Sequence, residues 1–165
     1  MKKLLLASTL LAAMTGTAMA AEIKVGVLLG YTGPIESLTP DMAASAELAF
    51  DEASNSGQLL GGSKIVSIRA DSTCVDSAAA TAAGERLISS HGVVAIMGAD
   101  CSGVTGAVAN NVAIPNGVVM VSPSATSPGL SKIKDNGFFF RTAPSDARQG
   151  EVLATVLKSR GIMEV

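Results

Sequence analysis

A cysteine and a serine stand side by side in the segment GADCSG, residues 98–103, where an apolar run ends and a run of small residues begins. Cys101 or Ser102 could act as a nucleophile, form one half of a disulfide, or line a binding site. A nucleophile needs a base within hydrogen-bonding distance, and that base is usually histidine. His91 is the only histidine. Because it precedes the apolar run, we expect it at the opposite end of that strand, roughly 15–20 Å from Ser102. We therefore expect no catalytic residue and no enzymatic activity.

A second polar segment, SPSATSP at residues 122–128, also follows an apolar run. In an open parallel sheet, ligands bind beyond the carboxyl ends of the strands, where loops lead into helices with free backbone N–H groups. Both segments combine small hydroxyl residues with exposed backbone donors, which suits a carboxylate or a similar anion. Neither segment carries a positive side chain, so the donors are neutral dipoles. This favours a compact zwitterion as the ligand over a polyphosphate.

Other residues near strand ends have two interpretations each. Asp71 and Asp100 could bind a cation, but carboxylates at such positions more often accept hydrogen bonds from turns, and we favour that role. Tyr31, the only tyrosine, could face a ligand or cover the loop after the first strand, so we keep it as a candidate ligand-binding residue. The three phenylalanines at residues 138–140 are predicted to be core residues.

Metal and cofactor sites have little support in the sequence. With one histidine and two cysteines, the chain predicts no metal site. It also lacks the G-x-G-x-x-G, P-loop and G-x-S-x-G patterns, and we expect no cofactor.

Four short apolar runs must position these residues. They are predicted to be buried strands at residues 23–30, 64–72, 93–98 and 118–122. Helical segments alternate with them at intervals that suit crossover connections between parallel strands. The alternation predicts an α/β fold, an open parallel sheet with helices on both faces.

Three longer helices are predicted, at residues 41–57, 75–92 and 146–161. Their expected N-caps are Asp41 for the first, Asp76 or Ser77 for the second, and Asp146 for the third. Residues 163–165 look like the start of another strand. A strand that stops after a few residues is typical of a fragment, so we expect this chain to be the N-terminal portion of a longer protein.

The first twenty residues predict the compartment. Two lysines precede an apolar stretch at residues 4–14, and residues 18–20 form a small-x-small cleavage site. The apolar stretch is too short for a bilayer span, which takes roughly 20 residues. We predict a signal peptide at residues 1–20, cleaved after Ala20, and an exported mature protein.

Net charge and cysteine count narrow the partners and the chemistry. The formal net charge is -2 and there is no basic run, so we expect neither nucleic acid nor an anionic membrane surface as a partner. In an oxidising compartment an even number of cysteines usually indicates pairing. The chain has two, Cys74 and Cys101, so one disulfide is expected.

Several features form a specific combination when they are taken together. They are a Thr-Gly-Pro loop at 32–34, a cysteine before the second helix, Cys-Ser at 101–102, the 122–128 loop, and Phe-Arg-Thr at 140–142 with an aspartate and a glutamine beyond it. With them, nearly the whole chain after residue 20 resembles the periplasmic leucine/isoleucine/valine-binding proteins. These are solute receptors of amino-acid ABC transporters with the type I periplasmic-binding fold.

This resemblance implies roles for particular residues. In that family the two matching cysteines form a disulfide, which agrees with a bond between Cys74 and Cys101. The family's pattern implies that the Ser102 hydroxyl binds the carboxylate of the ligand. It implies backbone contacts at Ser124, and backbone and hydroxyl contacts at Thr126, shared between the carboxylate and the amino group. The ligand would be a branched-chain or related amino acid.

The resemblance also implies a domain organisation. Members are about twice this length, and two lobes close on the ligand. Residues 21–143 would form the first, ligand-binding lobe, which is incomplete, and residues 144–165 the crossing and the start of a truncated second lobe. We expect a periplasmic, monomeric receptor that delivers an amino acid to the permease subunits of an ABC importer. The alternative is the ligand-sensing domain of a signalling or regulatory system with the same fold.

Overall fold

The structure, a computed structural model, describes residues 21–164. The predicted signal peptide and the last residue lie outside the described part. The elements in chain order are β1 (Glu22–Leu29), α1 (Thr39–Asn55), β2 (Lys64–Asp71), α2 (Ser77–Ser89), β3 (Ala95–Gly98), α3 (Ser102–Val108), the π-helical turn η1 (Ala109–Ala113), β4 (Val119–Ser122), the 3-10 turn η2 (Pro128–Lys132), β5 (Phe139–Arg141) and α4 (Asp146–Ser159).

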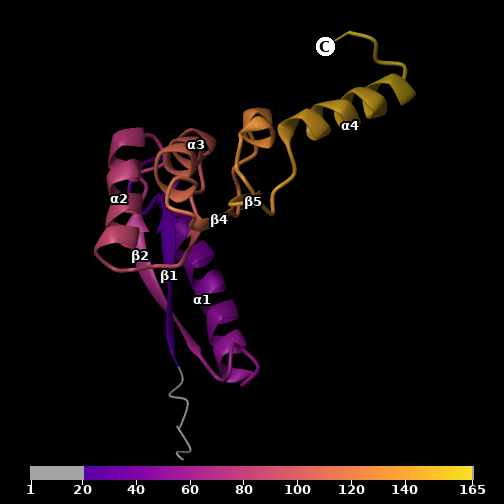
Figure 1. The fold of residues 1–165 in the computed structure, drawn as a ribbon. Coiled ribbons are helices and arrows are strands. Elements are labelled where there is room, and N and C mark those ends of the chain that lie inside the picture. Colours follow the sequence, from indigo (N-terminus) through magenta and orange to yellow (C-terminus); the bar gives the residue numbers. More distant parts are fainter. Residues whose placement is uncertain (1–20, 165) are drawn as a thin grey trace, which may run out of the picture.

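The strands form one parallel sheet in the order β2-β1-β3-β4-β5 (Figure 1). In the register, Leu28 of β1 stands opposite Ala70 of β2 on one side and Gly98 of β3 on the other. Because every strand runs in the same direction, all the carboxyl ends meet at one edge of the sheet. The predicted fold class is confirmed, and the carboxyl edge is where the polar segments of the sequence converge.

The two faces of the sheet are covered unequally. Leu28, Ile96 and Met120 point to the face that α2, α3 and η1 cover, and all three are buried. Val27 and Leu29 point to the opposite face, where they pack on α1. Successive strand residues alternate between faces, so β1 contributes Leu28 to one cluster and Val27 and Leu29 to the other. Complete burial of one such aliphatic side chain stabilises the fold by about 1.5–3 kcal/mol, and the first face holds most of the buried residues.

The short edge strand β5 adds to the four strands predicted from the apolar runs. Phe139 is buried, but Phe140 is 53% exposed. In the register Phe140 follows Val121 and Met97 across the sheet, which places it on the α1 face. Phe138 is half-buried, so the prediction that all three phenylalanines belong to the core is confirmed only for Phe139. It is wrong for Phe140, which lies at the exposed edge of the sheet.

Two of the predicted helix starts are wrong. α1 begins at Thr39 with Pro40 in its first turn, and Asp41 lies inside that turn. Proline suits the first turn because its fixed φ is helical and its missing N–H would have no intrahelical partner there. For α4 the cap is Ser145, whose hydroxyl accepts from the backbone N–H of Ala147 at 3.3 Å.

Of the two residues predicted as the N-cap of α2, Asp76 is confirmed. The carboxylate of Asp76 accepts hydrogen bonds from the backbone N–H groups of Ala78 at 2.9 Å and Ala79 at 3.0 Å. Ser77 is the first residue of the helix and not its cap. A cap of this kind typically stabilises a helix by about 1 kcal/mol.

Helix α4 extends away from the sheet and the other helices (Figure 1), and none of its residues is buried. The strand predicted to start after it is absent at Met163 and Glu164, the last described residues of that segment. Within residues 21–164, no helix is both long and apolar enough to cross a membrane.

Candidate functional site

One buried carboxylate joins several strand ends at the carboxyl edge. The side chain of Asp100, which follows β3, accepts hydrogen bonds from the backbone N–H of Gly30 at 2.6 Å, the hydroxyl of Ser72 at 3.1 Å and the backbone N–H of Cys101 at 2.9 Å. Gly30 follows β1 and Ser72 follows β2. The Ser124 hydroxyl, beyond β4, donates to the backbone carbonyl of Asp100 at 3.0 Å. The predicted role of Asp100 in turns is confirmed and extends to four loops.

The predicted disulfide between Cys74 and Cys101 is present, with a Cα–Cα distance of 5.1 Å. It links the turn before α2 to the residue that precedes α3. Together with Asp100 it attaches the loop after β3 to the loops after β1 and β2. Ser102 is the next residue, so its position depends on both attachments.

Ser102 and Thr126 are in direct contact. The hydroxyl oxygen of Ser102 accepts hydrogen bonds from the backbone N–H groups of Thr126 and Ser127, both at 3.1 Å. A serine hydroxyl has two acceptor lone pairs and one proton to donate. The proton of Ser102 therefore stays available for an oxygen outside the loop. Ser102 and Thr126 are half-buried, and Ser124 is exposed, so these predicted site residues lie together at a solvent-accessible edge.

The loop that carries Thr126 is held from behind by Arg141 of β5. The guanidinium Nη1 of Arg141 donates to the backbone carbonyls of Ala125 at 3.1 Å and Ser127 at 2.8 Å. Its Nη2 donates to the hydroxyl of Ser131 at 2.6 Å. Carbonyls of this loop thus accept from Arg141, whereas the N–H groups of Thr126 and Ser127 donate to Ser102.

Sequence reasoning missed the role of Arg141. Neither polar segment carries a positive side chain, as predicted, but a guanidinium from another strand contacts the 122–128 loop. The signal that could have found it is the arginine that directly follows three phenylalanines, since a charged residue at the end of a strand usually has a partner at the sheet edge.

Tyr31 lies on the α1 face, packed against Val27, Leu29 and Ala43. The guanidinium carbon of Arg69 lies 5.8 Å from the centroid of its ring, within cation–π range. Its hydroxyl is buried with no hydrogen-bond partner among the described residues. Burial raises the pKa of Tyr31 to about 12, although the positive charge of Arg69 opposes this shift. The ring covers the start of the loop, and a ligand contact by Tyr31 stays a prediction.

Asp71 has the turn role that the sequence predicts. Its carboxylate accepts from the Thr32 hydroxyl at 2.6 Å, from the Thr32 backbone N–H at 3.3 Å and from the Thr73 backbone N–H at 2.8 Å. Partial burial raises the pKa of Asp71, but these hydrogen bonds to the charged form outweigh burial and hold the pKa below its usual value. Across residues 21–164, no group of three or more potential metal-ligating side chains lies close enough to hold an ion.

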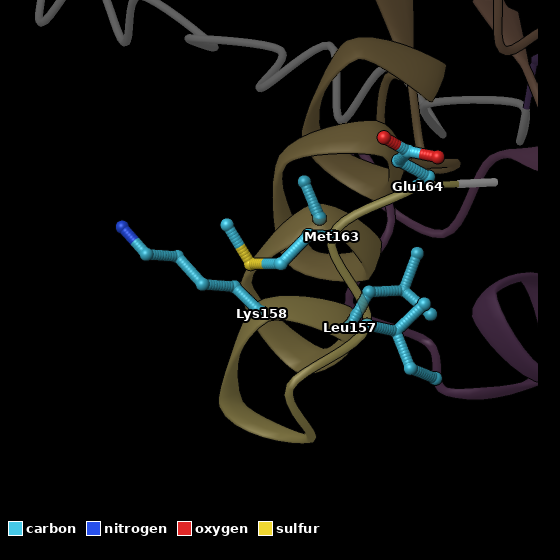
Figure 2. A pocket seen from close by; sticks show the side chains of 6 residues that line it. Leu157, Lys158, Met163 and Glu164 are labelled. Atoms are coloured by element: carbon cyan, nitrogen blue, oxygen red, sulfur yellow. The ribbon is translucent and has the colours of Figure 1, made fainter.

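Hollows elsewhere on the molecule are apolar and separate from the residues above. One of about 200 Å³ lies where the chain folds back on the end of α4; Figure 2 shows Leu157, Met163 and Glu164 around it, with the Lys158 ammonium pointing away. Another, of about 440 Å³, lies along the first turns of α4. A third, of about 320 Å³, lies between Phe50 of α1 and the sheet. None of the three is lined by a predicted ligand-binding residue.

A family model described as "Periplasmic binding protein" matches residues 22–165, so the chain belongs to that family of substrate-binding proteins. The resemblance inferred from the sequence is thereby confirmed.

Proteins similar in sequence to this chain have names that specify a ligand class within the family. The Leu/Ile/Val-binding protein BraC3 of Rhizobium johnstonii is 33% identical over 156 residues, which cover 93% of this chain and 41% of the relative. The Leu/Ile/Val-binding protein homolog 3 of Brucella melitensis is 34% identical over 158 residues, covering 94% of this chain and 42% of the relative. The chain thus spans about two fifths of the length of these relatives.

Solved structures of branched-chain amino acid receptors have the same fold. The substrate binding protein LivJ of Streptococcus pneumoniae, in complex with isoleucine, matches with a TM-score of 0.73 and 29% identity over 82% of this chain and 38% of that chain. An ABC transporter substrate-binding protein of Desulfitobacterium hafniense in complex with Leu matches with a TM-score of 0.72 and 29% identity, over 85% and 39% of the two chains.

Proposed function

We propose that this chain is the amino-acid-binding first lobe of a periplasmic receptor that delivers its ligand to an ABC importer. The observation that carries the proposal is the contact between Ser102 and the 122–128 loop. The Ser102 oxygen binds two backbone N–H groups of that loop and keeps its proton for a ligand oxygen. A binding site made of neutral donors on a rigid sheet edge suits the carboxylate of an amino acid.

Each site residue has a proposed role in binding. The Ser102 hydroxyl donates to the ligand carboxylate. The Thr126 backbone N–H is already bonded to Ser102, so the hydroxyl of Thr126 supplies its main ligand contact. Ser124 contributes its backbone, because its hydroxyl is bonded to Asp100. Tyr31 contributes from the α1 side. No step forms or breaks a covalent bond, so the proposed activity is binding without catalysis.

The proposed organisation follows that of the relatives. Residues 21–143 form the ligand-binding lobe, and residues 144–165 form the crossing toward a second lobe. The signal peptide is removed after Ala20, and the mature receptor is a monomer that docks on permease subunits in the membrane. The names of the matched relatives, which are binding proteins for Leu, Ile and Val, support a transport receptor over a sensor domain.

A titration of residues 21–165 with L-leucine, followed by amide chemical shifts, tests the proposal. A ligand on this edge keeps contact with water on one side because Ser124 is exposed and Ser102 is half-buried. We therefore expect weak, millimolar binding, with shifts confined to Ser102, Ser124, Thr126 and their neighbours. L-leucinamide, which lacks the carboxylate, is the matched control and should cause no such shifts. Equal shifts with both compounds, or none with leucine, would contradict the proposal.

A further inference from the structure

Asp100 is an unusual residue to find beneath an anion-binding edge. It is 2% exposed, and its carboxylate lies between the ends of three strands. A carboxylate removed from water is unfavourable unless hydrogen bonds replace its hydration. Here all three neighbours donate to it: two backbone N–H groups and one hydroxyl. Hydrogen bonds to an ionised acceptor are shorter and stronger than neutral ones, so these links hold the strand ends firmly.

The links from Asp100 lead to the proposed ligand contacts. Its side chain holds the N–H of Cys101, the residue before Ser102, and its carbonyl holds the hydroxyl of Ser124. Ser102 in turn holds the N–H of Thr126. The residues that would touch the carboxylate of a ligand are thus attached, directly or through one or two neighbours, to a single buried residue.

Asp100 also provides a link that the disulfide does not. The bond between Cys74 and Cys101 connects only the loops after β2 and β3. The loop after β1 is joined to the loop after β3 by the 2.6 Å hydrogen bond from Gly30 to Asp100, whereas its hydrogen bonds from Thr32 to Asp71 reach only the end of β2. A Cβ at Gly30 would lie 3.2 Å from both the Asp100 carboxylate and the Cys74 side chain, so glycine permits this close approach.

We propose that Asp100 is a positioning residue for ligand binding: it holds Ser102, Ser124 and the 122–128 loop in their ligand-binding arrangement before the ligand arrives. The part of this inference that concerns ligand affinity rests on the proposed function. Pre-arranged groups bind more tightly because the ligand does not have to order them. Asp100 itself does not touch the ligand, because its carboxylate is occupied by internal donors.

Asp100→Asn is the sharpest test because it keeps the shape of the side chain. In either orientation the new amide NH₂ faces a backbone N–H, that of Gly30 or that of Cys101, so one hydrogen bond is lost. We expect hydrogen exchange at Gly30, Cys101, Thr126 and Ser127 to become at least about tenfold faster. The Kd for L-leucine should rise by about tenfold, as expected for the loss of a hydrogen bond to a charged group.

Two control variants separate positioning from general destabilisation. Val112→Ala removes buried volume from η1, which provides none of the proposed ligand contacts. Compared at temperatures where each protein is fully folded, it should leave the Kd and the four amides within about twofold of the parent. Asp71→Asn, which removes a half-buried turn carboxylate at a neighbouring strand end, should leave hydrogen exchange at Thr126 and Ser127 within about twofold of the parent. If Asp100→Asn does not fold, Ser72→Ala removes one donor while keeping the carboxylate, and it should give a smaller change in the same amides.

The outcomes are distinct for the two proposals. If hydrogen exchange in Asp100→Asn accelerates only at the site amides, the positioning role is supported. If the parent shows no chemical-shift changes with leucine, only the proposed function is contradicted. The inference is overturned if Asp100→Asn leaves the site amides or the Kd within about twofold of the parent. It is equally overturned if Val112→Ala changes them as much as Asp100→Asn does.

Discussion

Two charged residues of opposite sign hold the candidate site from opposite sides. The Asp100 side comprises Asp100 and the donors Gly30, Ser72 and Cys101. Here a carboxylate accepts hydrogen bonds from N–H and O–H groups. The Arg141 side comprises Arg141 and its acceptors in the loop after β4. Here a guanidinium donates hydrogen bonds to backbone carbonyls and a hydroxyl. Arg141 binds carbonyls of the loop after β4, and Asp100 binds the donors at the ends of the neighbouring strands.

The difference between the two sides is burial. Asp100 is 2% exposed, whereas Arg141 is only half-buried. If Asp100 is removed, buried donors lose their partner and water cannot replace it. If Arg141 is removed, water can reach the carbonyls of the loop and satisfy them. We therefore expect changes on the Asp100 side to have the larger effect on stability, and each prediction below tests that expectation.

The largest effect should come from loss of the disulfide on the Asp100 side. Replacement of Cys74 and Cys101 together by alanine frees a loop with a sequence separation of 27. The chain-entropy relation gives a loss of roughly 3.6 kcal/mol in the free energy of unfolding. Urea denaturation of the parent and the double variant measures this loss. A loss below about 1 kcal/mol would show that hydrogen bonds alone hold this side.

A smaller effect is expected on the Arg141 side. Arg141→Gln removes the charge and the paired donors, and it should lower the free energy of unfolding by about 1–2 kcal/mol, since water can reach the freed carbonyls. Arg141→Lys keeps the charge without the planar fork and should recover only part of this loss. Thermal denaturation compares the variants. A greater destabilisation by Arg141→Gln than by Asp100→Asn would reverse the proposed ranking of the two sides.

Ser102 connects the two sides, so its hydroxyl should affect binding more than folding. Ser102→Ala removes the acceptor for the Thr126 and Ser127 N–H groups, which are half-buried and can be rehydrated. We expect a loss of about 0.5–1.5 kcal/mol in the free energy of unfolding. Binding of L-leucine should weaken by about tenfold, because the carboxylate loses a donor as well. Ser127→Ala keeps the backbone N–H groups and serves as the control, with unchanged binding.

The smallest effect is expected for Asp71, a half-buried carboxylate at the end of β2. The pKa of Asp71 is lowered in the folded protein, so its contribution is present above the unfolded pKa of about 3.9 and is lost as the pH falls through the folded value. Because Asp71 is partly exposed, we expect less than about 1 kcal/mol. Glu47, whose pKa is lowered chiefly by its hydrogen bond from Arg69, titrates in the same acidic range. The difference between parent and Asp71→Asn in acid denaturation isolates Asp71, and identical curves would contradict the prediction.

The strands were the most predictable part of the fold. The four that were predicted contain the signal in their own residues, and β1, β3 and β4 have buried residues as expected. The prediction that residues 64–72 form a buried strand is wrong, because β2 lies at the edge of the sheet and has no buried residue. β5 was not predicted because it has only three residues and one of them, Phe140, is exposed. A strand at the edge of a sheet forms through its neighbour, here by pairing with β4, and its own composition shows little of this.

The helix caps show how local competition limits prediction. Asp76 was one of two caps predicted for its helix, and the structure selects it over its neighbour Ser77. Asp41 and Asp146 were wrong because Pro40 and Ser145 allow each helix to begin earlier. Aspartate within the first turn remains favourable, since its charge interacts with the positive end of the helix dipole. The residue type was informative, but its exact position was not.

The sequence by itself determined the class of this protein: the alternation of apolar runs and helical segments, the cysteine pair and the two hydroxyl-rich loops led to a parallel α/β sheet of the periplasmic binding protein family. These signals are local, because each depends on residues close together in the chain. The roles of Asp100 and Arg141 were decided only by the tertiary structure. Asp100 accepts from Gly30, 70 residues away, and Arg141 donates to Ala125, 16 residues away. The strands of the sheet bring such groups together at their ends, and the spacing of residues along the chain does not indicate which groups will meet.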